Sequence, residues 1–241
     1  MAIMTWTKNE RIAILTMTNG ENRQNLVFAQ TLNAMLDEIV ADKSVSSLII
    51  TSNDEKNFSQ GIDVEWILTR MQNKEYQPIN DFIIGMDNVF KKLLLAPVPT
   101  IAAINGHAYG NGSIMSCACD FRFMRQDRGF FCFPEVNLGI PFRHGMNAII
   151  KKAVPMYKLL EMQLSGNRYA ATELALHHII VKACADKEEL MADAITFAGT
   201  FQKKRGIFGE LKKRLYKDII KIIDTGDPAG VMGADSLMMS D

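Results

Sequence analysis

Hydrophobic residues recur along the chain with two different periods, and the changes of period mark the expected strands and helices. Residues 2–7 and 11–17 alternate or run apolar around a turn-prone segment, which predicts an N-terminal hairpin. Residues 26–40 carry apolar side chains at helical spacing, and residues 45–51 have the pattern of a buried strand. A helix between two strands favours a parallel crossover.

The same alternation continues through the middle of the chain and then fades. It predicts helices at 82–95 and 111–118 and strands at 100–104 and 120–124. Beyond Pro141 the pattern is helical, with one extended segment at 179–182; the expected helices are 146–153, 156–164, 171–176, 188–201 and 207–223. We therefore expect an α/β core over residues 1–185 and a C-terminal helical region over residues 186–241.

The composition indicates which binding partners and which metal or disulfide sites are unexpected for this chain. The 241 residues are 48% apolar, and Lys plus Arg equal Asp plus Glu at 27 each, so bulk charge gives no reason to expect nucleic acid or an anionic membrane. The four cysteines lack the paired spacing of a zinc site and are expected to be buried free thiols in a reducing compartment. The basic clusters 203–205 and 212–214 are typical of a solvated helix face, with contact to an anionic ligand as the alternative.

Targeting signals are not evident in the sequence. The N-terminal residues 1–6 are too short and too mixed for a signal peptide, and no apolar run approaches the length of a membrane span. Residues 238–241 do not match a peroxisomal address. We expect a cytoplasmic protein without a membrane partner.

Two glycine-containing turns are candidates for binding an oxyanion. Residues 105–112 hold three glycines between a strand and a helix start, where backbone N–H groups are left unpaired and the helix dipole is positive. Residues 58–63 form a second turn, and Asp63 is placed to cap a helix that begins at Val64. Together they supply two N–H donors, the usual minimum for a developing oxyanion.

Glu135 is the candidate base. It lies in the mostly apolar segment 133–139, where the surroundings tune a carboxyl pKa for proton transfer. An anion site with one base indicates enolate chemistry. The structural alternatives are that Glu135 caps a turn or pairs with Arg143, and that the glycine cluster is a plain turn.

Three blocks of sequence resemble the crotonase superfamily, the enoyl-CoA hydratases and isomerases. They are F-S-Q-G-I-D at 58–63, N-G-H-A-Y-G-N-G at 105–112 and F-P-E-V-N-L-G-I-P at 133–141. The resemblance implies an α/β crotonase (ClpP/crotonase-like) fold with a repeated ββα superhelix core and a C-terminal helical region for trimerisation. It also implies an acyl-CoA thioester substrate, a homotrimer or hexamer, no metal, and no cofactor beyond the coenzyme A that belongs to the substrate.

The resemblance also assigns site residues. The backbone N–H groups of Ile62 and Asn111 would form an oxyanion hole for the thioester carbonyl, and Glu135 would be the catalytic base. His107 is expected to be structural, and Arg143 with His144 to narrow the choice of acyl group. The remaining expected substrate-binding residues are Gly61, Asp63, Gly110, Gly112, Ile114, Trp66 and Phe142, although aromatic residues in such segments belong more often to the core.

Ile114 is the informative departure from the family pattern. Hydratases of the family carry a second glutamate at this position, and isoleucine neither activates water nor donates a proton. A single carboxylate suffices to move a proton from C2 to C4, so we expect a Δ3,Δ2-enoyl-CoA isomerase. Residues 61–66 and 123–129 are similar to the plant-type isomerases. The alternatives are a hydratase, another CoA-thioester hydrolase or lyase that uses His144 or a substrate group, and a non-catalytic acyl-CoA-binding protein.

Overall fold

The computed structural model describes residues 2–226 of the chain. Residues 238–241, which the sequence predicts not to be a peroxisomal address, lie outside the described residues. Within residues 2–226, no helix combines the length and the apolar character that crossing a membrane requires. All four cysteines are free and buried, as predicted.

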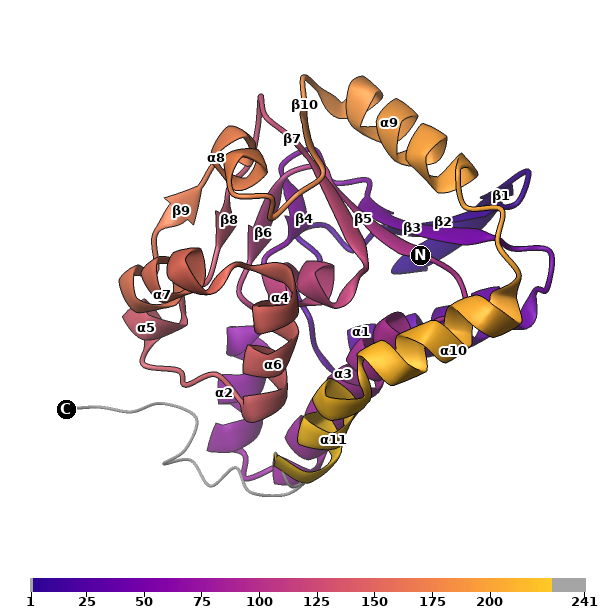
Figure 1. The fold of residues 1–241 in the computed structure, drawn as a ribbon. Coiled ribbons are helices and arrows are strands. Elements are labelled where there is room, and N and C mark those ends of the chain that lie inside the picture. The colour runs from indigo at the N-terminus through magenta and orange to yellow at the C-terminus, as the bar shows by residue number, and fades with distance from the viewer. Residues whose placement is uncertain (1, 227–241) are drawn as a thin grey trace.

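A six-stranded sheet forms the centre of the fold (Figure 1). Its strand order is β1-β2-β3-β5-β7-β10, and every neighbouring pair is parallel except the N-terminal hairpin β1–β2. The predicted hairpin and the parallel crossover after it are therefore confirmed. The strands are Met4–Asn9 (β1), Ile12–Met17 (β2), Ser47–Ser52 (β3), Thr100–Ile104 (β5), Phe121–Arg125 (β7) and Lys182–Cys184 (β10).

Both faces of this sheet are covered by helices, which explains why its central strands β3 and β5 are buried along their whole length. One face packs on helices α1 (Leu26–Ala41) and α3 (Tyr76–Leu95), and the other packs on α9 (Lys187–Gly199) (Figure 1). Successive side chains of a strand point to opposite faces. Thus Leu48 of β3 joins the larger core, whereas its neighbour Ile49 joins the smaller core beneath α9.

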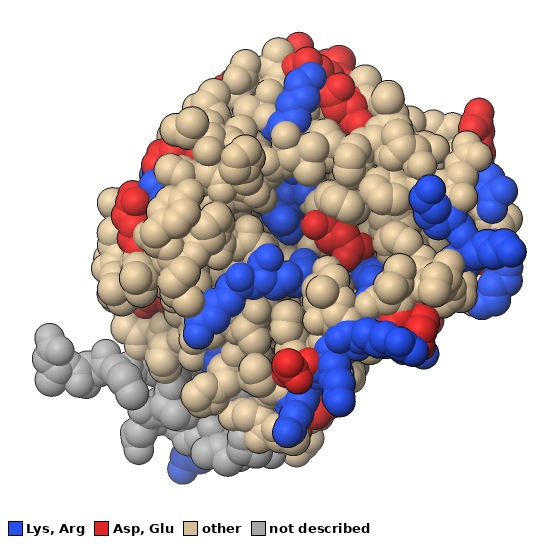
Figure 2. All heavy atoms as spheres, in the orientation of Figure 1, with Lys and Arg blue, Asp and Glu red and all other residues tan. Residues whose placement is uncertain are grey.

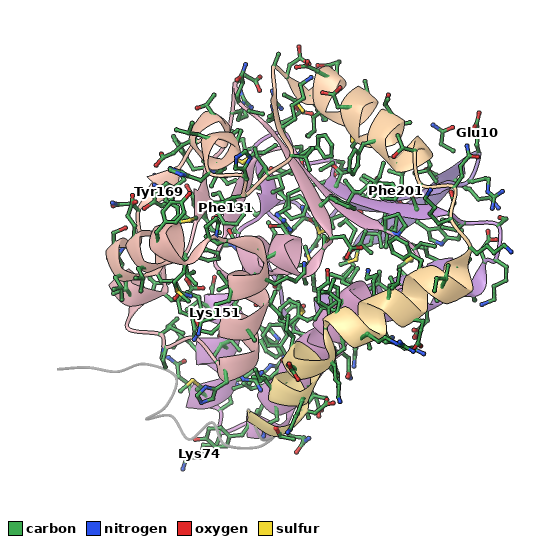
Figure 3. All side chains as sticks on the ribbon, viewed as in Figure 1. Glu10, Lys74, Phe131, Lys151, Tyr169 and Phe201 are labelled. Atoms are coloured by element: carbon green, nitrogen blue, oxygen red, sulfur yellow. The ribbon has the colours of Figure 1, made fainter. Side chains whose placement is uncertain are left out.

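A second sheet consists of four short strands in the order β4-β6-β8-β9. The sequence does not predict them, because two or three residues establish no hydrophobic period. Phe131 and Tyr169, labelled in Figure 3, lie opposite each other on the antiparallel pair β8–β9. The strands are Asn57–Ser59 (β4), His107–Tyr109 (β6), Phe131–Cys132 (β8) and Arg168–Tyr169 (β9), so β6 lies inside the glycine-dense segment predicted as a turn.

The predicted helices are present, with shifted ends in several cases. Helix α3 begins at Tyr76 instead of residue 82, because Pro78 falls in its first turn, where proline is tolerated. The prediction of an extended segment at 179–182 holds only at Lys182, where strand β10 starts; residues 179–181 form a bend. Helices α4 (Asn111–Ala118) and α8 (Ala171–Leu176) have the predicted bounds, and α6 (His144–Ala153) and α7 (Met156–Ser165) extend slightly beyond them.

The single helix predicted at 207–223 is two helices, α10 (Arg205–Leu215) and α11 (Lys217–Gly226). The break falls at Tyr216, which is buried and donates its hydroxyl to Asp120 Oδ1 at 3.3 Å. No proline or glycine marks this position. What distinguishes Tyr216 is its buried contact with Asp120, which is distant in the sequence. The predicted boundary at residue 185 stays a prediction.

A buried ion pair fastens the C-terminal helices to the core. Lys212 Nζ of α10 lies 2.7 Å from Asp120 Oδ2, and both side chains are less than one tenth exposed. The same carboxylate accepts the Thr100 amide at 2.9 Å, which ties α10 to the start of β5. Arg205 similarly donates to main-chain carbonyls that follow α1. Figure 2 shows the other basic side chains of this region interspersed with acidic ones, as on a solvated face.

We predict that Lys212→Ala lowers the free energy of unfolding by about 3–5 kcal/mol, because it leaves the Asp120 carboxylate buried without its cation. Lys213→Ala is the matched control, since the neighbouring lysine is exposed, and it should change the free energy by less than about 0.5 kcal/mol. Urea unfolding of the two variants measures the difference. Equal losses would contradict a structural role for the pair.

Candidate active site

The first glycine turn holds the amide of Ile62 in a fixed position. Gln24 N–H donates to Gly61 O at 2.8 Å, and Asp63 N–H donates to Gln24 O at 2.9 Å. Asp63 also caps helix α2 (Val64–Gln72) by accepting the Trp66 amide at 3.1 Å, as predicted. These bonds engage the Gly61 carbonyl and the Asp63 amide, on either side of Ile62. The Ile62 N–H itself has no acceptor within residues 2–226.

The second glycine turn leads directly into helix α4. Gly110 has a φ of +51°, which favours glycine, and its N–H donates to Cys132 O at 3.0 Å. Asn111 is the first residue of the helix, so its N–H has no intrahelical acceptor and lies at the positive end of the helix dipole. The amide is therefore available to an anionic oxygen.

The two turns touch each other. A Cβ atom on Gly61 would lie 2.5 Å from Tyr109 O and 3.1 Å from Asn111 N, so only glycine permits this approach. A Cβ on Gly112 would lie 2.6 Å from Ser59 O, which brings α4 equally close to β4. The amides of Ile62 and Asn111 are thus held in neighbouring segments of backbone.

A chain of buried side chains locks the two turns together. Asn111 Nδ2 donates to Gln24 Oε1 at 2.6 Å, and Gln24 Nε2 donates to Ser59 Oγ at 3.2 Å. Ser59 Oγ in turn donates to Asn22 O at 2.7 Å. The hydrophobic pattern gives no sign of Gln24, because its position depends on contacts with residues distant in the sequence.

Glu135 lies beside the second turn. It begins helix α5 (Glu135–Leu138), and its Oε1 would be 3.2 Å from a Cβ on Gly110. Its Oε2 is buried and has no hydrogen-bond partner among the residues that the structure describes. Burial raises the pKa of Glu135 to about 7, whereas a backbone hydrogen bond has a smaller, lowering effect on that pKa. The carboxyl group is therefore poised to exchange a proton near neutral pH.

The predicted alternative partner of Glu135 is engaged elsewhere. Arg143 Nη1 donates to both carboxylate oxygens of Asp87, at 3.1 and 3.0 Å. The structural interpretation in which Glu135 pairs with Arg143 is therefore wrong. Asp87 was not among the residues that the sequence indicated.

A cavity of about 140 Å³ brings the candidate groups together. Ile62, Gly110, Asn111, Ile114 and Glu135 all line it, as the sequence predicts for a shared site. The rest of its wall is mostly apolar and comes from α2, α3, the segment after α5 and α6, including Ile67, Met71, Ile79, Phe82, Met86, Leu138, Ile140 and Met146.

Several predicted substrate-binding residues support the cavity without lining it. The Trp66 ring packs edge-on against Phe82 at 5.9 Å between centroids, and the Phe142 ring packs against Phe133 at 6.0 Å. His144 is the first residue of α6. Gly61, Asp63 and Gly112 shape the two turns, as described above. Their direct contact with substrate stays a prediction.

His107 has the structural position expected of it. Its ring stacks on Phe130 at 5.9 Å and lies 5.0 Å from the ring of Tyr109. Its Nδ1 accepts the Phe130 amide at 3.2 Å, and it does not line the cavity. Partial burial lowers the pKa of His107, which favours the neutral ring.

Two unpaired amides beside one buried carboxylate, in an apolar cavity, define a site for acid–base chemistry on a substrate whose oxygen gains negative charge. The comparison with known proteins agrees with this class of site. The chain belongs to the enoyl-CoA hydratase/isomerase family, whose model matches residues 7–222.

Relatives within this family carry different activities in their names. Enoyl-CoA delta isomerase 2, peroxisomal, of Arabidopsis thaliana is 29% identical over 230 residues, which cover 91% of this chain and 94% of the relative. Crotonyl-CoA hydratase of Syntrophomonas wolfei is 30% identical over 213 residues, which cover 87% of this chain and 78% of the relative. The chain is thus similar to isomerases and to hydratases at comparable identity.

Solved structures confirm the expected crotonase fold. An enoyl-CoA hydratase from Mycobacterium ulcerans superimposes with a TM-score of 0.83 at 21% identity, covering 93% of this chain and 96% of that chain. A mycobacterial enoyl-CoA isomerase superimposes with a TM-score of 0.82 at 22% identity, covering 93% and 95%. At these identities the likeness shows the fold alone.

Because burial raises its pKa, ionised Glu135 should destabilise the folded state. Below about pH 4.5 the carboxyl is neutral in both the folded and the unfolded state; stability is then lost as the pH rises towards about 7. At about 1.4 kcal/mol for each pKa unit, the loss reaches about 3 kcal/mol. We predict that Glu135→Gln is more stable than the wild type at pH 8 by about 2–3 kcal/mol, with most of this gain absent at pH 4.5.

Urea unfolding at the two pH values measures this effect. The matched control is Glu38→Gln, which alters an exposed glutamate of α1 and should shift stability little at either pH. A Glu135→Gln variant whose advantage over the wild type is the same at both pH values would contradict the raised pKa.

Proposed function

We propose that the protein is a Δ3,Δ2-enoyl-CoA isomerase that uses Glu135 as its single base. The observation that carries this proposal is that the cavity wall holds one carboxylate free to act as a base, Glu135, together with the apolar side chain of Ile114. Ile114 is fully buried and lines the same cavity as Glu135, and the other carboxylate in the wall, Asp87, is held by Arg143. Among the residues that the structure describes, Glu135 is then the one carboxylate in that wall without a cation.

In the proposed reaction, Glu135 removes a proton from C2 of a 3-enoyl thioester. The electron pair moves onto the thioester oxygen, where the N–H groups of Ile62 and Asn111 stabilise the oxyanion. Removing one such donor typically costs about 3–4 kcal/mol of transition-state stabilisation. The enolate then collapses with the double bond between C2 and C3, and Glu135 returns the proton to C4.

The surroundings of Glu135 suit this proton shuttle. A base with a pKa of about 7 accepts a proton from carbon and gives it back to carbon within the same turnover. The cavity wall around it is apolar, which keeps water from competing for the enolate. Coenzyme A enters as part of the substrate, and the proposed reaction needs no further cofactor or metal.

Hydration is the second candidate function, and the similarity to crotonyl-CoA hydratase of Syntrophomonas wolfei favours it. Hydration requires a second group that orients the attacking water or donates a proton to the substrate. The position expected to carry that group holds Ile114. A substrate group or His144, at the start of α6, would have to replace it.

We further propose that the protein lies in the cytoplasm and assembles into a homotrimer or hexamer. The support for this assembly is a stripe of exposed apolar residues on α10, namely Ile207, Leu211 and Leu215, at the spacing of one helix face. A stripe of this kind is suited to a protein partner.

We predict that the purified protein converts 3-hexenoyl-CoA into the conjugated 2-enoyl product, measured by the absorbance of the conjugated thioester. Glu135→Gln should lower kcat by about 10²–10⁴-fold, because it removes the base without changing the size of the side chain. Glu38→Gln is the control for an exposed glutamate and should retain wild-type turnover.

Three results would contradict the proposed activity or the role of Glu135 in it. Full activity of Glu135→Gln would exclude it as the base. Formation of 3-hydroxyacyl-CoA from a 2-enoyl substrate, with oxygen taken from water, would select the hydratase. Acyl-CoA binding without turnover would select a non-catalytic binding protein.

We also predict how kcat/KM depends on pH. The free enzyme must hold Glu135 in its ionised form, so kcat/KM should rise tenfold per pH unit below an apparent pKa of about 7 and level off above it. A pH–rate profile with 3-hexenoyl-CoA measures this value. A profile that is flat between about pH 5.5 and pH 8 would mean that the essential base titrates elsewhere.

A further inference from the structure

The cavity contains a partly buried ion pair that the proposed chemistry does not use. Asp87 of α3 and Arg143, which precedes α6, are 14–16% exposed at their side chains and lie 3.0 Å apart. Both line the cavity, among walls that are otherwise mostly apolar. The pair therefore joins two elements on the inside of the cavity.

The segment that carries Arg143 is fixed to the segment that carries Glu135. Ile140 N–H donates to Glu135 O at 3.0 Å, and the ring of Phe142 packs on that of Phe133. Asp87 lies on α3 one residue after Met86 and one turn after Ile83, both of which are also in the wall. The ion pair is thus held at a set position relative to the base.

The volume of the cavity limits what fits within it. A hydrocarbon-lined cavity of about 150 Å³ in another protein holds one benzene molecule, which has six carbons. The cavity of about 140 Å³ is of similar size. By that comparison the cavity suits an acyl segment of about six carbons.

We propose that the Asp87–Arg143 ion pair sets the acyl-chain length of this enzyme and restricts it to short-chain thioesters of about six carbons. This rests on the proposed function only in taking an acyl-CoA as the ligand. An alkyl chain that reaches the pair displaces water from two charged side chains. It cannot replace the hydrogen bonds that this water makes, so its binding is unfavourable. A chain that ends before the pair contacts apolar wall alone.

The test replaces the ion pair by apolar side chains of similar size, Asp87→Leu with Arg143→Met. Both are changed together, because either change alone removes one partner of a partly buried ion pair. The dissociation constants of saturated hexanoyl-CoA and decanoyl-CoA are measured by calorimetry, and kcat/KM is measured with the matching 3-enoyl thioesters. Binding of the saturated compounds does not depend on turnover, so it separates this proposal from the isomerase assignment.

The wild type should bind hexanoyl-CoA at least as tightly as decanoyl-CoA. In the double variant the ratio should move towards decanoyl-CoA by about tenfold or more, because each newly buried methylene favours binding by about fourfold. The control is Asp37→Leu with Lys92→Met, which removes the exposed ion pair between α1 and α3 and should leave the ratio unchanged.

Two results would overturn the proposal. One is a wild type that binds decanoyl-CoA about tenfold more tightly than hexanoyl-CoA, a result that needs no variant to fold. The other is a folded double variant with the wild-type ratio. A wild type that shows the predicted length preference without turnover would overturn the isomerase and keep the role of the pair; absence of any acyl-CoA binding would overturn both.

Discussion

The close approach of two backbone turns governs this site. Gly61 and Gly112 lie where any side chain would overlap main-chain atoms of the facing segment, at distances of 2.5 and 2.6 Å. Because hydrogen alone occupies these positions, the amide of Ile62 and the first amide of α4 are held in adjoining backbone. The buried chain from Asn111 through Gln24 to Ser59 then maintains that approach by hydrogen bonds.

The buried carboxylate of Glu135 also lowers the stability of the folded protein when it ionises, and apolar burial elsewhere in the fold offsets this loss. A carboxylate whose pKa is raised to about 7 by burial destabilises the folded protein once it ionises. The two-sided central sheet and the helices α1, α3 and α9 supply the apolar burial that tolerates this cost. The same cost makes Glu135 basic enough to take a proton from carbon, so the instability and the proposed activity have one physical origin.

Local pattern predicts the elements that are long or bounded by clear signals. Helix α4 and strand β5 have their predicted ends, since a glycine-rich turn separates an apolar strand from a helix start. The remaining features depend on contacts between residues that are distant in the sequence, and hydrophobic periodicity does not predict such contacts. The short strands of the second sheet, the break at Tyr216 and the pairing of Arg143 with Asp87 are all of this kind.

The candidate site divides in the same way. The glycine turns and Glu135 form recognisable sequence blocks, and the structure brings Ile62, Asn111 and Glu135 to one cavity. Gln24 and Asp87 lie in ordinary helical or loop sequence, so only the three-dimensional structure indicates them. Ile114 belongs to both groups, because its position was predicted and its burial in the cavity wall gives that position its chemical meaning.

Enolate formation by Glu135 is tested most directly by hydrogen exchange at C2 of a saturated acyl-CoA, hexanoyl-CoA, followed by NMR in deuterated water. This compound has no double bond to move and no site for water addition, so exchange reports enolate formation alone. We expect deuterium incorporation at C2 with the wild type and its loss in Glu135→Gln at unchanged hexanoyl-CoA affinity. Equal exchange by the two proteins, or binding of hexanoyl-CoA by the wild type without exchange, would contradict enolate formation by Glu135.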